Sequence, residues 1–280
     1  MQPAALVLFT TCTLALFAQE QPDLRELVRR SVQKDRVNAN RAKDYTYIQR
    51  TETRDRDEKG QVVKTESRTF DVMMIGEQRF RKLIARDDKA LPEKEARKAQ
   101  EDFDKAIHRH ESEAGKPAKD DTNDRAILME MPDAFIFTLV GPESIDGRAV
   151  WVIDAKPKPG FRGKAKRWEL LTKFKGRLWI DQSDLQWVRV EAETIAPVSF
   201  GWVIARLEPG AKIGFQQSRV NSEFWLPMRA TAELNARLGF KTIRSDTVVT
   251  WRDYRKYRTD SRMISSEEAA PAPAALQRQE

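Results

Sequence analysis

Cysteine is almost absent from this sequence: Cys12 is the only one in 280 residues. Cys12 lies inside an N-terminal segment that we expect to be removed, which leaves a chain without any thiol. Disulfides, thiolate catalysis and cysteine-based metal sites are therefore excluded for the remaining chain. A lipoprotein signal would place a Leu-Ala-Gly-like triplet before its cysteine, and Phe9-Thr10-Thr11 matches that poorly. Lipidation at Cys12 stays a minor alternative.

Charge is missing from the first eighteen residues, "MQPAALVLFTTCTLALFA". The segment is too short for a comfortable membrane span and ends in Leu16-Phe17-Ala18, a tolerable small-residue cleavage signal. We predict a secretory signal peptide over residues 1–18. Because the usual basic start is missing, a misplaced start codon or an uncleaved anchor are the alternatives. No later stretch approaches eighteen apolar residues, so the mature chain is predicted to be soluble.

Familiar catalytic motifs are lacking too. The sequence contains no HExxH, EF-hand loop, P-loop or GxSxG elbow. Its two histidines, His108 and His110, would point about 200° apart on a helix at ~100° per residue, and only on a strand could they share a metal. The many carboxylates are interleaved with Lys and Arg, and no apolar pocket signature that would raise a pKa surrounds them. No metal or cofactor is predicted, and paired-carboxylate hydrolysis is kept as a weaker alternative.

Positive charge is in excess, with a net charge of +7 that is unchanged by removal of the uncharged leader. In an exported protein this favours contact with anionic lipid or envelope polymer over nucleic acid. No nucleic-acid-binding motif occurs, and the aromatic residues do not sit in basic repeats. We therefore predict transient contact with a membrane surface and no nucleic-acid partner.

Three segments have helical patterns. Residues 22–42 carry a 3.6-period apolar stripe behind Pro22 and Asp23, which suit a first turn. Residues 91–112 form a charged helix with a thin apolar stripe. A short helix near 122–131 follows a polar loop. The stripes consist of Leu24, Leu27, Val28, Ser31 and Val32 in the first helix, and of Ala96, Ala99, Phe103, Ala106 and Ile107 in the second.

The rest of the chain alternates like β-strands separated by turn signals. Strands are predicted at 44–56, 61–75, 77–86, 135–140, 148–155, 167–174, 177–181, 186–195, 199–207, 211–220, 225–236 and 242–254. Many short strands of this kind indicate an antiparallel barrel or open half-barrel. The fold class is therefore mainly β (α+β), with one domain over 19–263 and a patternless, disordered Ala/Pro-rich tail over 264–280.

One hairpin, "GRLWIDQSDLQWVRVEAE" from Gly176 to Glu193, concentrates two tryptophans and several carboxylates. Alternation places Leu178 and Ile180 on one face, and Trp187 with Arg189 on the face opposite Val188. The Asp181-Gln182-Ser183-Asp184 turn explains its own aspartates, and a solvated sheet face explains the glutamates. The hairpin therefore needs no catalytic interpretation.

Aromatic residues in strands are candidates for an apolar cavity, although each is also a normal core residue. Alternation pairs Tyr45 with Tyr47 on one face, and Phe70 with Val72 and Met74. Burial of acyl methylenes in such a cavity contributes ~0.8 kcal/mol each. Arg79 and Arg81 could hold a helix over the cavity or bind a lipid head group, and solvent exposure is the simpler alternative. The candidate ligand-binding residues are Tyr45, Tyr47, Phe70, Met74, Arg79, Arg81, Trp151, Trp179 and Trp202.

Several stretches, in this order, resemble the periplasmic LolA/LolB-like superfamily, which includes lipoprotein-sorting carriers and regulators of the MucB/RseB type. They are "GEQRFRKL" (Gly76–Leu83), the Trp-Ile-Asp hairpin, and "EFWLPMRATAEL" (Glu223–Leu234), after a leader and one helix. The resemblance covers roughly Pro22 to Met263. The sequence departs from simple carriers by a charged helical insertion near 91–122, and by the absence of a proline usual in the Arg79 strand.

The resemblance implies an open antiparallel half-barrel of about ten or more strands, with the inserted helices acting as a lid over an apolar cavity. It implies a non-catalytic periplasmic protein that binds acyl chains or lipidated proteins. A regulator that binds a membrane-anchored protein partner is the alternative within that fold. An envelope hydrolase, or a protein that only stiffens the envelope, is the alternative outside it.

Overall fold

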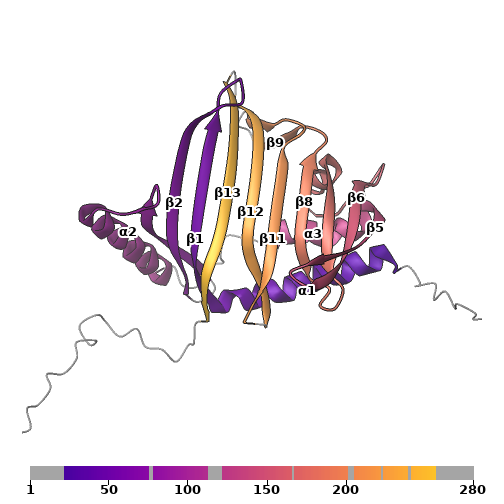
Figure 1. Ribbon diagram of the computed structural model, residues 1–280, viewed down its shortest axis with the longest axis horizontal. Coiled ribbons are helices and arrows are strands. Elements are labelled where there is room, and N and C mark those ends of the chain that lie inside the picture. Colours follow the sequence, from indigo (N-terminus) through magenta and orange to yellow (C-terminus); the bar gives the residue numbers. More distant parts are fainter. Residues whose placement is uncertain are drawn as a thin grey trace, which may run out of the picture.

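One open antiparallel sheet dominates the protein. The computed structural model describes residues 22–75, 78–112, 122–165, 167–200, 205–221, 223–238 and 241–256, so the predicted leader and tail lie outside the described residues. Thirteen strands run in the order β4-β3-β2-β1-β13-β12-β11-β8-β7-β6-β5, with β9 and β10 off this path. The sheet curves and stays unclosed (Figure 1), which confirms the predicted mainly β half-barrel with an N-terminal helix.

The longest strands, β2, β1, β13 and β12, lie side by side near the middle of the sheet. In chain order the elements are α1 (Leu24–Arg41), η1 (Ala42–Asp44), β1 (Tyr45–Arg56), β2 (Val62–Ile75), β3 (Gln78–Arg86), β4 (Lys89–Ala90), α2 (Glu93–Ser112), α3 (Thr122–Ala134), β5 (Phe135–Ile145), β6 (Arg148–Pro157), η2 (Trp168–Lys173), β7 (Phe174–Asp181), β8 (Trp187–Thr194), β9 (Val198–Phe200), β10 (Ala205–Leu207), β11 (Lys212–Val220), β12 (Phe224–Leu238) and β13 (Lys241–Lys256).

Most predicted elements are found within one to three residues of their predicted ends, and one is wrong. The predicted strand at 167–174 is the 3-10 helix η2, preceded by Arg167 with a φ of 70°. The Thr172 hydroxyl donates to the Glu169 carbonyl, a local bond that competes with strand pairing. Leu171 is buried against α3 and β5, so tertiary packing overrides the alternating pattern. The predicted strand at 199–207 corresponds to two short strands, β9 and β10, on either side of residues outside the description.

The helix α1 lies across one end of the sheet (Figure 1). Asp23 caps it, because its carboxylate accepts hydrogen bonds from the amides of Arg25 and Glu26. Its predicted apolar stripe is buried, with Val28 fully enclosed. Leu27, Val28 and Val32 pack on Ile153, Leu178, Ile180 and Trp187, which form the main core. Each such aliphatic side chain contributes roughly 1.5–3 kcal/mol on burial.

The other two helices lie at opposite ends of the sheet. Near β5, α3 packs on α1 and η2, with Ile127 in a second small core. At the other end, α2 lies beside β3 (Figure 1) and inserts Phe103 against Phe80. Because α2 packs on β3, it borders the edge of the sheet opposite β5 and α3. Among the described residues, no helix is both long and apolar enough to cross a membrane.

Candidate functional site

The two faces of the sheet have opposite chemistry. We call the face on which α1 packs the inner face, and the other the outer face. Cross-strand partners point to the same side of a sheet, so the register assigns residues to a face. One inner row crosses the sheet continuously from the main core to the far strands. It consists of Leu178, Val190, Phe215, Ala230, Val249, Thr51 and Arg68.

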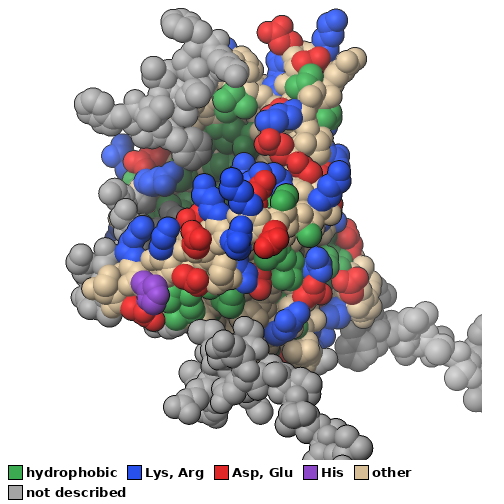
Figure 2. Space-filling model, turned by 90° about the vertical axis from the view of Figure 1, so that its left-hand side faces the viewer, with side chains coloured by type: hydrophobic (Ala, Val, Ile, Leu, Met, Phe, Trp, Pro, Cys, Tyr) green, Lys and Arg blue, Asp and Glu red, His purple; other side chains and the backbone are tan. Residues whose placement is uncertain are grey.

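The inner face is mostly apolar and only partly covered. A second inner row runs through Gly176, Ala192, Ile213, Ala232, Thr247 and Thr53. Ile213 keeps 39% of its surface exposed and Ile243, further along β13, keeps 36%. Phe215, Ala230 and Val249 are half-buried. Seen from the side of α2, the molecule has a hollow with hydrophobic side chains at its bottom (Figure 2).

The outer face of the same strands carries ion pairs. Lys175 pairs with Glu193, Arg177 with Asp154, Arg189 with Glu191, Lys212 with Glu233 and Arg56 with Asp246. A shallow groove of about 560 Å³ lies among these side chains. Since the cations and the anions that line the groove are equal in number, the groove has no strong preference for a ligand of either sign. The outer face is solvated at these ion pairs, and the inner face is the candidate binding surface.

Tyrosine rings form one end of the inner face. Tyr45 is fully buried, with its ring centroid 5.9 Å from Phe224 and 6.3 Å from Tyr254. Tyr47 lies 5.3 Å from Tyr254. Burial raises the pKa of Tyr47, against the opposing effect of the Arg79 and Arg81 charges, and burial raises the pKa of Tyr254 further. The phenols of Tyr47 and Tyr254 are therefore neutral at neutral pH.

The structure brings together six of the nine predicted site residues. On β1, Tyr45 and Tyr47 adjoin β2, where Val72 opposes Tyr47. On β2 and β3, Met74 opposes Arg79 and Val72 opposes Arg81, while the Arg81 guanidinium lies 5.3 Å over the Phe70 ring. These residues share the inner face at the β1–β3 end of the sheet. The six are Tyr45, Tyr47, Phe70, Met74, Arg79 and Arg81.

The three predicted tryptophans do not join this group. Trp151 is partly buried against the core beneath α1. Trp179 is on the outer side, buried with Val150, Val152 and Trp225, and its indole donates to Glu143. Trp202 lies outside the described residues. Trp151 and Trp179 therefore have the surroundings of structural residues.

The hairpin of β7 and β8 differs from strict alternation at one point. The register shifts between Trp179 and Ile180, so Ile180 opposes Trp187 while Trp179 opposes Arg189. As a result, Trp187 lies on the inner face with Ile180 and donates to Ser31 of α1 at 2.6 Å. The expectation that Trp187 shares a face with Arg189 is wrong. A β-bulge places two successive residues, here Val188 and Arg189, on the same face.

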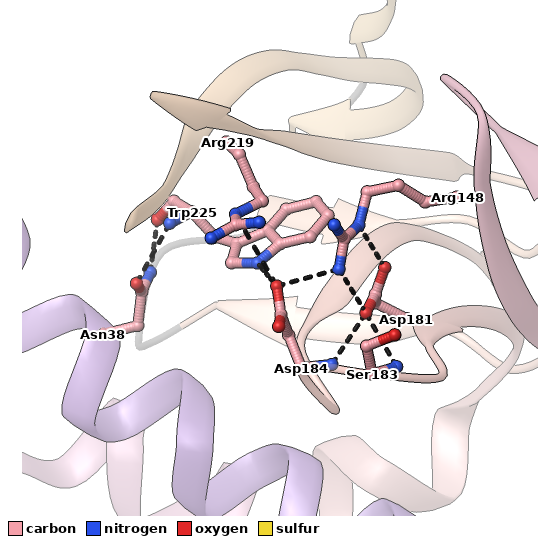
Figure 3. A network of polar contacts seen from close by, with 7 residues as sticks. All are labelled: Asn38, Arg148, Asp181, Ser183, Asp184, Arg219 and Trp225. Carbon is pink, nitrogen blue, oxygen red and sulfur yellow. Dashed lines mark hydrogen bonds and ion pairs between the residues drawn. The ribbon is translucent and has the colours of Figure 1, made fainter. Parts of the chain in front are cut away.

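The hairpin turn anchors a polar network (Figure 3). Asp181, 1% exposed, accepts two hydrogen bonds from Arg148 at 2.5 and 2.8 Å and two from the amides of Ser183 and Asp184. Asp184 accepts from the Trp225 indole at 2.9 Å and from Arg148 at 3.0 Å. The network therefore joins β6, the turn and β12, in addition to the turn bonds that the sequence predicts.

The helix α1 reaches the same network. The Asn38 side chain donates to the Trp225 carbonyl and accepts from the Trp225 amide (Figure 3). Asp35, one turn earlier, accepts from Gln186 and Gln217. These long-range bonds hold the helix to the residue before β8, to β11 and to β12.

The shifted carboxylates act as anchors. The pKa values of Glu52, Asp88, Asp133 and Asp154 are lowered, in each case chiefly by hydrogen bonds from an arginine. Burial alone would raise the pKa of Asp181, but Arg148 and the turn amides outweigh it and lower the pKa. A general acid at neutral pH needs the opposite shift. These five groups are therefore suited to pairing with arginines.

The two histidines lie on α2. His108 approaches Glu111 and His110 packs its ring against Phe80. Within the described ranges, no three His, Cys, Asp or Glu side chains are grouped so that they could hold a metal ion.

Reasoning from the sequence missed the small inner-face residues, which are Ala230, Ala232, Ala192 and Gly176. Their signal was the alternation in "MRATAEL", where alanines alternate with charged or polar residues. Small side chains leave space above the sheet between the bulkier Phe215 and Trp251. A strand in which alanines alternate with polar residues is therefore compatible with an open apolar face and with a packed core.

Comparison with solved structures shows likeness over most of the chain. The protein is similar to a DUF1329 family protein from Desulfovibrio piger, at 14% identity, covering 85% of this chain and 93% of that chain, with a TM-score of 0.35. It is similar to a LolA superfamily protein from Nitrosomonas europaea, at 12% identity, with coverages of 80% and 93% and a TM-score of 0.32. It is also similar to MucB in complex with MucA(peri), at 10% identity, with coverages of 85% and 100% and a TM-score of 0.25.

Two of these structures carry the names LolA and MucB, which are also the names of the proteins that the sequence motifs resemble. No family model matches the chain. No curated protein matches it either.

Proposed function

We propose that this protein is an exported, periplasmic carrier that shelters acyl chains of lipids or lipidated proteins on the inner face of its sheet. The observation that supports the proposal is the difference between the two faces of the same strands. Ile213, Phe215 and Val249 leave apolar surface accessible on the inner face, while the outer face is covered by ion pairs.

Binding by this surface needs no chemical step. Transfer of apolar chain from water onto apolar side chains is favourable by roughly 25 cal/mol per Å². The small residues Ala230, Ala232 and Gly176 leave room for a chain to lie along the sheet. Release at a membrane would reverse the same transfer, because the bilayer offers the chain an equally apolar environment.

The test compares one inner-face and one outer-face substitution at neighbouring positions. Uptake of a fluorescent fatty acid is measured by titration for the purified protein, for Ala232→Glu and for Thr231→Glu. We expect Ala232→Glu to weaken uptake at least about tenfold, because a buried carboxylate costs several kcal/mol. Thr231→Glu, on the outer face, should leave uptake unchanged.

Native mass spectrometry and organic extraction of the protein from a periplasm give an independent result. Co-purified acyl species that are lost in Ala232→Glu would support the carrier function. Circular dichroism checks that both variants are folded. A protein that takes up no fatty acid or phospholipid would contradict the proposal and favour a regulator that binds a protein partner. For that role the exposed Ile136 and Val140 of the edge strand β5 are the first surface to test.

A further inference from the structure

Two arginines on the inner face differ from most arginines of the sheet. Arg79 and Arg81 are exposed, and within the described part of the chain neither forms an ion pair with a carboxylate. Elsewhere in the sheet Arg50, Arg56, Arg148, Arg177 and Arg189 each pair with Asp or Glu. These five arginines are thus paired with carboxylates, whereas Arg79 and Arg81, like Arg68 of the inner row, have no carboxylate partner among the described residues.

The cross-strand neighbours of these arginines are apolar. Met74 and Val72, both buried, are their cross-strand partners. The Arg81 guanidinium lies over Phe70, and Arg81 and Phe70 both border a groove of about 480 Å³ between α2 and the sheet. Its lining is apolar at Leu83, Phe80 and Phe103 and charged at Arg86, Glu95, Lys98 and Asp102. Figure 2 shows Lys and Arg side chains gathered beside the hydrophobic hollow on this side of the molecule.

We propose that Arg79 and Arg81 bind the anionic head group, a carboxylate or a phosphate, of an amphiphile whose acyl chain lies on the inner face. This inference rests on the proposed function and names its ligand class. A guanidinium presents paired donors that match both oxyanions. A chain starting at β3 and crossing β2, β1 and β13 to β12 would run about 19 Å, at roughly 4.8 Å between strands. It would meet Tyr47, Trp251 and Ala230 on the way.

The arrangement predicts selection by head-group charge. A neutral lipid gains the same apolar contacts as an anionic one but leaves the arginines to water. Because Arg79 and Arg81 are exposed, each pair with an oxyanion is worth less than about 1 kcal/mol, so the two together give a preference of about fivefold. The preference should fall at 0.5 M salt, since exposed charges are screened over roughly 3–5 Å there.

The experiment measures the affinities of cis-parinaric acid and its uncharged methyl ester by fluorescence titration. The unmodified protein should bind the acid about fivefold more tightly than the ester. The double variant Arg79→Gln/Arg81→Gln should bind both with the affinity of the ester. The matched control, Arg229→Gln/Arg237→Gln, removes the same charge from exposed arginines of the outer face and should keep the preference.

A competition arm identifies the source of the head group. Displacement of parinaric acid by dodecyl phosphate is compared with its displacement by dodecanoate. Stronger competition by dodecyl phosphate indicates a phospholipid as the ligand. Stronger competition by dodecanoate indicates a free fatty acid. Equal binding of acid and ester by the unmodified protein, or a preference that survives in Arg79→Gln/Arg81→Gln, would overturn the head-group assignment alone. Failure of both probes to bind would overturn the carrier function together with it.

Discussion

Replacement of Asp181 by Asn tests whether the polar network of the β7–β8 turn stabilises the fold. The asparagine keeps an oxygen that can accept from the amides of Ser183 and Asp184. It loses the negative charge that receives the two hydrogen bonds of Arg148. The substitution therefore removes the ion pair while leaving the turn geometry available.

The cost follows from the burial of the pair. Breaking a buried ion pair costs about 3–5 kcal/mol. Arg148 is 29% exposed and retains Asp184 at 3.0 Å, so the expected loss for Asp181→Asn falls to about 2–3 kcal/mol. Asp154→Asn is the matched control, because Asp154 binds Arg177 in the same two-bond geometry but is 36% exposed. The control should lose less than about 1 kcal/mol.

Urea denaturation followed by circular dichroism measures both losses. The pKa of Asp181 is lowered in the folded protein, so its contribution is present above the unfolded carboxyl value of about 3.9 and disappears as the pH falls through the folded value. The difference between the unmodified protein and Asp181→Asn should therefore be constant at neutral pH and shrink below about pH 4. Equal losses for Asp181→Asn and Asp154→Asn would refute the reasoning from burial.

Three further substitutions or conditions have defined outcomes. Trp187→Phe removes the hydrogen bond to Ser31 and should lower the free energy of unfolding by about 1–2 kcal/mol in urea denaturation, since Ser31 stays buried. Asn38→Ala frees the backbone of Trp225, and hydrogen exchange at the Trp225 amide should become about tenfold faster or more. Burial raises the pKa of Tyr254, so titration at 295 nm should show a phenol that ionises later than free tyrosine; its stabilising effect is full below about pH 10 and declines as the pH rises further.

The helices and long strands were predictable because their patterns are strong and local. The 3.6-period stripe of α1 and its Asp23 cap correspond directly to the buried face and the observed hydrogen bonds. Alternation placed Tyr45 with Tyr47, and separately Val72 with Met74, on one face of each strand. The pairing of Tyr47 with Val72 then joins the two sets on one face of the sheet. In these segments local preference and tertiary packing agree.

The errors occur where non-local contacts decide. A single extra residue in β8 turns Trp187 toward α1, and no rule of alternation predicts where a bulge falls. The segment 167–174 alternates like a strand but forms the 3-10 helix η2. Burial of Leu171 near α3 stabilises that conformation. The sequence also could not show that Asp184 reaches Trp225, because that contact depends on how β11 and β12 pair.

The helix α1 also spans the curved sheet in a straight line from β5 to β12. Near its start, Arg25 pairs with Asp133 of α3, and near its end Asn38 holds Trp225 of β12. Its 18 residues span about 27 Å, a length that the helical hydrogen bonds keep nearly constant. The distance across the sheet between β5 and β12, which both contact α1, is therefore held nearly constant by this helix. Adjustment to occupants of different bulk is expected to fall on the strands beyond β12, where the tyrosines and the two inner-face arginines lie.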